Sequence, residues 1–298
     1  MISAVLITRF RQHVELFLKC EKAKVKQRYY YIIPWLVLSF IRIHGQAFTR
    51  IVNPSSGFGA YSRVSGDVMS LTSNQARLSG IKEPALGIYG ERRFFQSDLS
   101  HYLVMAAWIT AVGNFSLGLS TAGTGAYRET KFSVGAARRL GARLDVGIGF
   151  RYNTLGIASY GSASAITATV ACILYLSETL QVGFQVVNAG GGRYGSLERL
   201  GSIYSGGFGY DVSEKFYFGG EVIKEEGKNV CLQAGCHYQV ISRLFVRAGI
   251  ATGSSSVWMG VGIHVLTGRV DVTAAWHPLL GVTPGLGFNF RMVKRKTE

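Results

Sequence analysis

The sequence predicts an all-β protein: a transmembrane, up-and-down antiparallel β-barrel of about 14 strands, with an N-terminal segment inside its lumen. Three observations predict this class. The chain is hydrophobic, with a mean hydropathy of +0.20, yet after residue 47 it contains no unbroken apolar run of roughly 18 residues that could form a transmembrane helix. From Pro84 onward, short segments alternate apolar residues with small or polar ones. The connections between these segments also alternate in length, as the two ends of an outer-membrane barrel do.

The composition is rich in glycine and poor in charge, with 38 Gly and 16% charged residues among 298. A net charge of +15 raises the question of nucleic-acid binding. The basic residues lie mostly at strand ends, however, and no helix, finger or single basic face gathers them, so we expect no nucleic-acid partner. The four Cys form no disulfide framework, since Cys231 and Cys236 are five apart in one strand and face opposite sides.

Residues 1–47 are predicted to be a signal peptide. A basic stretch precedes an apolar core at residues 29–40, and the small residues Gly45 and Ala47 stand at the −3 and −1 positions of a cleavage site. The segment is longer than an ordinary signal peptide, so we expect a misassigned upstream start and a mature chain that begins at Phe48. The alternative is an N-terminal membrane anchor.

Residues 48–83 have no long periodic run, and a turn cluster occupies residues 53–57. We interpret this segment as plug-like and expect it to enter the lumen of the barrel. The barrel itself is predicted over residues 84–291, and residues 292–298 are predicted to be a basic periplasmic tail.

Fourteen candidate strands make up the predicted barrel. They span residues 84–93, 101–111, 114–122, 130–138, 143–153, 163–175, 180–188, 202–210, 215–224, 229–240, 243–251, 256–265, 269–276 and 283–291. The last one shows the pattern plainly: Leu286, Phe288 and Phe290 fall on one face, and Gly287 and Asn289 on the other. One face of such a strand suits lipid and the other a polar lumen.

The lengths of the connections distinguish this barrel from a soluble sandwich, which has no reason to sort its loops. Short turns follow the even-numbered strands, at residues 112–113, 140–141, 177–178, 212–213, 241–242 and 267–268. Most connections after odd-numbered strands are longer, at residues 94–100, 123–129, 154–162, 189–201 and 277–282. Short periplasmic turns, longer outer loops and an even number of strands put both termini in the periplasm.

Charged residues on inward faces are few, and they are the candidates for lining the lumen: Asp145, Arg151, Glu221, Arg247 and Asp271. Charges cannot face lipid at mid-depth cheaply, so they either pair with one another, bracing the lumen or holding a plug, or line a solute path. Both alternatives stay open at this point.

Signals for catalysis or cofactor binding are weak. Residues 190–195 match G-x-G-x-x-G, but no helix follows to meet a phosphate, so we interpret them as a loop. No nucleophile-elbow, zinc-protease or Cys/His metal spacing occurs. We therefore expect no enzymatic activity, no cofactor and no metal.

Two short stretches resemble a known family. Residues 60–78 resemble the N-terminal signature of the PorV/PorQ group of outer-membrane proteins of Bacteroidota, within the FadL-like superfamily, and residues 277–285 look like the closing region of that group. Gln75 stands where the family has Pro, a departure that bears on the turn geometry there. The matching positions of the first stretch are Ala60, Tyr61, Asp67, Asn74, Ala76 and Leu78.

The resemblance implies a 14-stranded barrel with an N-terminal segment inside it, located in the outer membrane of a Gram-negative cell. It implies a non-enzymatic, PorV-like protein that is a partner in type IX secretion or surface assembly. The alternative is a FadL-like passive transporter or channel for small or hydrophobic compounds, and a third possibility is a structural barrel with no path. The expected partners are outer-membrane lipid and secretion-system components or secreted cargo, with outer-loop contacts from Phe94, Phe95, Leu279 and Leu280.

Overall fold

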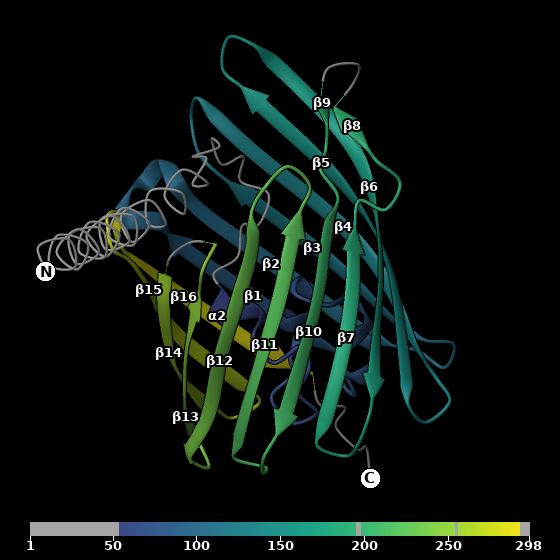
Figure 1. Cartoon of the computed structure of the whole chain (residues 1–298). Helices are drawn as coiled ribbons and strands as arrows, with labels where there is room; N and C mark the ends of the chain where they lie inside the picture. The colour runs from purple at the N-terminus through teal and green to yellow at the C-terminus, as the bar shows by residue number, and fades with distance from the viewer. Residues whose placement is uncertain (1–53, 195–197, 254–255, 293–298) are drawn as a thin grey trace, which may run out of the picture. The chain divides into compact units, whose positions relative to one another are not determined.

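The computed structural model describes residues 54–194, 198–253 and 256–292. They form a closed barrel of fourteen strands, each antiparallel to its neighbours, with the first strand paired to the last (Figure 1). Neighbours in the barrel follow chain order throughout, so the topology is up-and-down. The predicted fold class is confirmed.

The barrel strands are β1 to β7 and β10 to β16. Their bounds are β1 (Ala85–Arg92), β2 (Ser100–Ile109), β3 (Asn114–Ala122), β4 (Tyr127–Leu140), β5 (Leu144–Ile157), β6 (Gly161–Tyr175), β7 (Leu180–Val187), β10 (Ile203–Asp211), β11 (Phe216–Glu225), β12 (Val230–Ile241), β13 (Leu244–Ala251), β14 (Ser256–Val265), β15 (Gly268–His277) and β16 (Gly281–Arg291). Each of the fourteen predicted strands is present, with ends shifted by a few residues. The sequence interpretation missed a small hairpin, β8 (Arg193–Tyr194) with β9 (Glu198–Arg199), in the connection between β7 and β10.

The expected contrast in loop length is wrong at several connections. Residues 93–99 and 188–202 do form long connections, the first carrying the short 3₁₀ helices η3 (Arg93–Phe95) and η4 (Ser97–Leu99). The connections at residues 123–126, 158–160 and 278–280 are instead as short as the turns at the other end. The reason is that ladder pairing continues almost to the hairpin tips, for example from Tyr127 to Ile157 and from Ile157 to Gly161.

The two faces of the wall differ as the alternation predicts. Outward side chains are apolar and exposed, including Phe132, Val134, Ile148 and Phe150. Inward positions of the same strands carry buried polar or small residues, such as Lys131 opposite Asn153. This is the pattern required of a wall that meets lipid outside and a polar lumen inside. Among the described residues, no helix is long and apolar enough to cross a membrane.

Residues 54–83, which we call the plug, pack against the inward faces of the wall. They carry the one-turn helix α2 (Pro54–Gly57) and the 3₁₀ helices η1 (Val68–Thr72) and η2 (Gln75–Gly80). Two hydrophobic clusters join plug to wall. One packs plug residues Val68, Met69, Leu71 and Leu78 against Ala85, Tyr89, Leu103, Met105, Ala107 and Ala137 of the wall, and the other packs Ala60, Tyr61 and Ala76 against Ala171, Ile173 and Tyr175.

The plug lies so close to the wall that glycine is required at the contact. A Cβ added to Gly147 of β5 would lie 2.6 Å from the backbone nitrogen of Ala76. Gln75 also uses this closeness, since its N–H donates to Oε1 of Gln185 at 2.8 Å and its side-chain amide donates to Ser116 at 3.0 Å. Proline has no N–H to donate, so the departure from the family pattern at Gln75 adds a bond between plug and wall.

Candidate functional site

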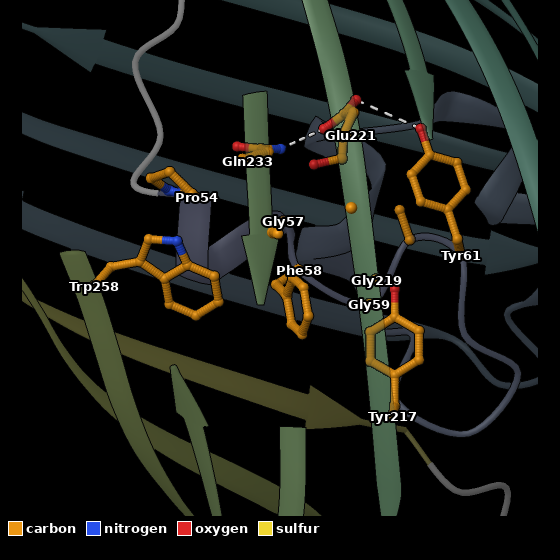
Figure 2. Close-up of a pocket in the computed structure, with 14 residues that line it drawn as sticks. Pro54, Gly57, Phe58, Gly59, Tyr61, Tyr217, Gly219, Glu221, Gln233 and Trp258 are labelled. Carbon is orange, nitrogen blue, oxygen red and sulfur yellow. Dashed lines mark hydrogen bonds between the residues drawn. The ribbon is translucent and has the colours of Figure 1, made fainter. Parts of the chain in front are cut away.

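A cavity lies inside the barrel between the plug and strands β11, β12 and β14. Figure 2 shows its aromatic lining, with Phe58 of the plug beside Tyr217 of β11 and Trp258 of β14. The ring centroid of Phe58 is 5.1 Å from that of Tyr217 and 5.2 Å from that of Trp258, and both pairs are tilted. We call the space between Tyr217 and Trp258 the aromatic slot. In this structure the plug itself fills the slot, through Phe58.

The free space that remains is small, with a cavity volume of about 20 Å³. That is room for one water molecule and not for an organic ligand. A solute could therefore occupy the aromatic slot only if the plug side chain left it.

Polar side chains also line the cavity, among them Tyr61, Glu221 and Gln233. The carboxylate of Glu221 accepts from the hydroxyl of Tyr61 at 3.4 Å and from the side-chain amide of Gln233 (Figure 2). Trp258 differs from these residues, because it is 1% exposed and its indole N–H has no hydrogen-bond partner among the residues that the structure describes. A buried donor without an acceptor costs about 1–3 kcal/mol, so this N–H marks a place where an acceptor is missing.

Glycines of β11 and β12 leave room for the two wall rings. A Cβ added to Gly235 of β12 would lie 2.7 Å from Cζ2 of Trp258, and one added to Gly219 would lie 2.3 Å from the hydroxyl of Tyr217. The rings thus lie across the wall at positions that any side chain would block. Part of the glycine excess in the sequence serves these rings, and part serves the approach of the plug.

A cluster of buried charges fastens the plug to β13 and β15, the two strands that flank β14 of the cavity wall. Arg247 of β13 donates to the backbone carbonyl of Ser55 at 3.0 Å and to Asp271 of β15 at 3.1 Å. Arg269 of β15 forms ion pairs with Asp271 and with Asp67 of the plug. Burial raises the pKa of Asp67, but the charges of Arg269 and Arg247 outweigh this effect and hold the pKa below its ordinary value. Asp67 is therefore charged at neutral pH.

The predicted lumen-lining residues all lie on inward faces, but they do not form one site. Arg247 and Asp271 belong to the charge cluster, and Glu221 belongs to the cavity. Asp145 accepts from Nε of Arg139 at 2.7 Å and lies on another part of the wall. Arg151 makes no side-chain hydrogen bond or ion pair within the part of the chain that the structure describes.

The residues of the family motif hold the plug in shape. Ala60, Tyr61, Asn74, Ala76 and Leu78 are buried against the wall. The carboxylate of Asp67 caps the start of η1, and the side chain of Asn74 caps the start of η2.

The predicted outer-loop residues divide into two groups. Phe95, Leu279 and Leu280 are exposed by 66%, 88% and 55%. Phe94 is half-buried instead, because its N–H donates to Thr283 at 3.2 Å and its ring lies edge-on to His277. The described residues contain no group of three or more His, Cys, Asp or Glu that could hold a metal ion.

Comparisons with known proteins show the class of fold. No protein-family model and no curated protein sequence matches the chain. Among solved structures, the CymD monoaromatic hydrocarbon channel aligns with a TM-score of 0.62 at 12% identity, over 83% of this chain and 99% of that one. The P. putida toluene transporter TodX aligns at 0.56 and 9% identity, over 80% and 99%, and a Pseudomonas aeruginosa FadL homologue at 0.53 and 9%, over 79% and 94%.

The chain therefore has the fold of the FadL-like hydrocarbon channels. At this level of identity the similarity shows the fold alone. It lends no support to the specific PorV assignment, to a link with Bacteroidota or to a role in type IX secretion. Of the two functional hypotheses from the sequence, the similarity therefore favours the alternative, a passive channel, over the leading one. The structures that resemble this chain are channels, not enzymes.

Sequence reasoning missed several residues that define the cavity and the charge cluster. Phe58 lies two residues before the stretch of residues 60–78 on which the resemblance rests. Tyr217 and Trp258 carried a usable signal, because each is a large aromatic residue on an inward face that holds mainly small or polar residues. Arg269 stood at the first position of a predicted strand, and alternation places it on the same inward face as Asp271, so a signal for it was also available.

Proposed function

We propose that this protein is a passive outer-membrane channel for small hydrophobic compounds. One observation carries the proposal: the lumen contains an aromatic slot that is closed by a side chain of the plug, Phe58, and not by a permanent wall residue. Rings in such a slot offer a solute apolar contact in a place that water does not fill.

The filled lumen supports a channel for hydrophobic compounds better than it supports an open porin. A porin exposes a broad, water-filled polar lining. Here the plug packs two hydrophobic clusters and a charge cluster against the wall, and the cavity beside Phe58 holds no more than one water. The fold shared with CymD and TodX, which are named as hydrocarbon channels or transporters, supports the same class of solute.

The proposed orientation follows from the two ends of the barrel. The N–H of Met292 donates to the carbonyl of Pro84 at 2.7 Å, so the first and last strands begin and end together. We place this end in the periplasm and the long connections, residues 93–99 and 188–202, outside the cell. The outward apolar side chains then face outer-membrane lipid.

The test is uptake by cells of a Gram-negative host with an intact lipopolysaccharide layer. Cells that produce the full chain should accumulate ethylbenzene several times faster than cells with an empty vector. The uptake of a polar solute of similar size, such as glycerol, should stay unchanged. Equal ethylbenzene uptake with and without the folded protein in the outer membrane would contradict the proposal.

A further inference from the structure

The aromatic slot is shaped for one six-membered ring. Phe58 places a single phenyl group between Tyr217 and Trp258, at centroid distances of 5.1 and 5.2 Å, which are typical of favourable aromatic pairs. Phe58 is only half-buried and is the one ring of the three that belongs to the plug. If Phe58 left, the vacated space would take one six-membered ring, the size of the phenyl group that it now holds.

The slot also contains one unsatisfied polar group. The indole N–H of Trp258 is buried and has no acceptor within the described part of the chain, although the ring lines the cavity. In Figure 2 the nitrogen lies on the edge of the ring nearest Pro54, away from the edge nearest Phe58. A pure hydrocarbon in the slot would leave this donor unpaired. A compound with an acceptor oxygen next to its ring would satisfy it.

We infer that the slot binds a monocyclic aromatic compound that carries a hydrogen-bond acceptor, such as an aryl ketone, and that this compound displaces Phe58 and accepts from the Trp258 N–H. The inference rests on the proposed function and narrows its substrate class. The phenyl ring of Phe58 acts as a built-in substitute for the ligand ring. In the closed state, the one-water cavity allows a water molecule to meet the N–H, and the ligand oxygen replaces that water.

The chemistry of the Trp258 indole requires an acceptor, and not a donor, on the ligand. Indole N–H is a donor only, so it cannot satisfy a ligand that offers only N–H or O–H hydrogens. The nearby carboxylate of Glu221 already accepts hydrogen bonds from Tyr61 and Gln233, so these three polar groups of the cavity are bonded to one another. The donor that recognises the ligand oxygen is therefore the N–H of Trp258.

Two matched probes test the inference: 4-fluoroacetophenone, which has a ketone, and 1-ethyl-4-fluorobenzene, in which a methylene replaces the carbonyl. Saturable binding to the full-length protein in detergent is followed by ¹⁹F NMR against empty micelles. Trp258→Phe keeps a ring and removes only the N–H. The control is Trp276→Phe, at an outward-facing position that is 51% exposed.

We expect the wild type to bind the ketone about three- to tenfold more tightly than the hydrocarbon, the range that one hydrogen bond supplies. Trp258→Phe should remove this preference and leave hydrocarbon binding within about twofold. Phe58→Ala should strengthen the binding of both probes, because it removes the competing ring. Trp276→Phe should change neither.

Three results would overturn the inference. The first is a ketone preference that survives Trp258→Phe, and the second is equal binding of both probes to the wild type. The third is a Phe58→Ala variant with a heat-modifiable barrel and unchanged affinities. Any of these results combined with protein-dependent ethylbenzene uptake by cells would leave the proposed function standing, whereas loss of both the binding and the uptake would remove both.

Discussion

Asp67 in the plug and Arg269 on β15 form a buried ion pair between residues 202 positions apart in the chain. Arg269 also pairs with Asp271 on its own strand, so a single guanidinium joins the plug to the wall. The carboxylate of Asp67 caps η1 as well, which ties the local fold of the plug to its attachment. This pair therefore links the attachment of the plug to one charged residue of the wall.

Replacement of Asp67 by Asn should loosen the plug. The variant keeps the size of the side chain but loses a charged partner of Arg269, which costs about 1.5–3 kcal/mol of plug attachment. The measurement is thiol labelling of a cysteine at Leu71, which is buried in the wild type. Labelling should be several times faster in Asp67→Asn, after subtraction of labelling of the native cysteines.

The matched control is Asp98→Asn, which removes an exposed carboxylate that accepts from Thr124, a residue of the next loop and not of the plug. Its labelling should equal that of the parent. Equal protection in Asp67→Asn and the parent would show that the ion pair does not hold the plug.

The same pair predicts a pH dependence. The pKa of Asp67 in the folded protein is below its ordinary value of 3.8, chiefly because the charges of Arg269 and Arg247 outweigh the effect of burial. The stabilisation is therefore fully present above about pH 4 and is lost as pH falls through the depressed folded value. Resistance of the plug to pepsin should stay constant from pH 5 to 4 and fall below that. The fall should be weaker in Asp67→Asn, and an equal fall in both proteins would assign it to other groups.

The sequence was sufficient to predict the strands of the barrel wall, but not to predict which side chains meet inside the lumen. Strict alternation along strands such as β14 placed Trp258 on the inward face, because a period of two leaves only two faces to choose from. What Trp258 touches was not predictable, since its partners Gly235 and Phe58 depend on register and on the path of an irregular segment. Loop lengths also failed as a guide, because ladder pairing near Ile157 continued past the polar residues that suggested a loop.

For the inward-facing charged residues, the sequence likewise predicted burial but not the pairing partners. Burial of Asp145 and Asp271 follows from strand alternation. The pairing of Asp271 with Arg247 reaches from β15 to β13 across β14, a contact that depends on register and that the alternation within one strand does not contain. The prediction of a 1–47 signal peptide lies outside the described residues and stays a prediction, as does that of a basic tail over residues 292–298, of which only Met292 is described.

Glycine at position 262 should be required for the charge cluster. A Cβ there would lie 2.0 Å from Cζ of Phe245 and would also meet the carboxylate of Asp271. Phe245 is 1% exposed and lies against Arg247 and Arg269, so it has no free space to move into. Gly262→Ala should destabilise the barrel by about 1–3 kcal/mol, measured as a lower midpoint of the heat-induced mobility shift.

Two further variants make that prediction specific. Phe245→Leu combined with Gly262→Ala should recover part of the loss, because the smaller side chain removes the contact. Gly190→Ala should have no effect, since nothing lies within 4 Å of a Cβ added there. A Gly262→Ala barrel as stable as the wild type would show that Phe245 can move.

The plug should also prevent bulk conduction. In planar bilayers the intact protein should show little or no steady conductance, because two hydrophobic clusters and the Asp67–Arg269 pair hold the plug across the lumen. Removal of residues 54–80 should leave a fourteen-stranded barrel, whose lumen is wide enough to fill with water, and should give stable currents. A heat-dependent mobility shift confirms that the shortened barrel is folded.

Phe58→Ala, which empties the aromatic slot but keeps both hydrophobic clusters, should remain closed to ions. Large and steady currents from the intact protein would contradict a channel that admits hydrophobic compounds through a plugged lumen, and they would favour an open pore instead.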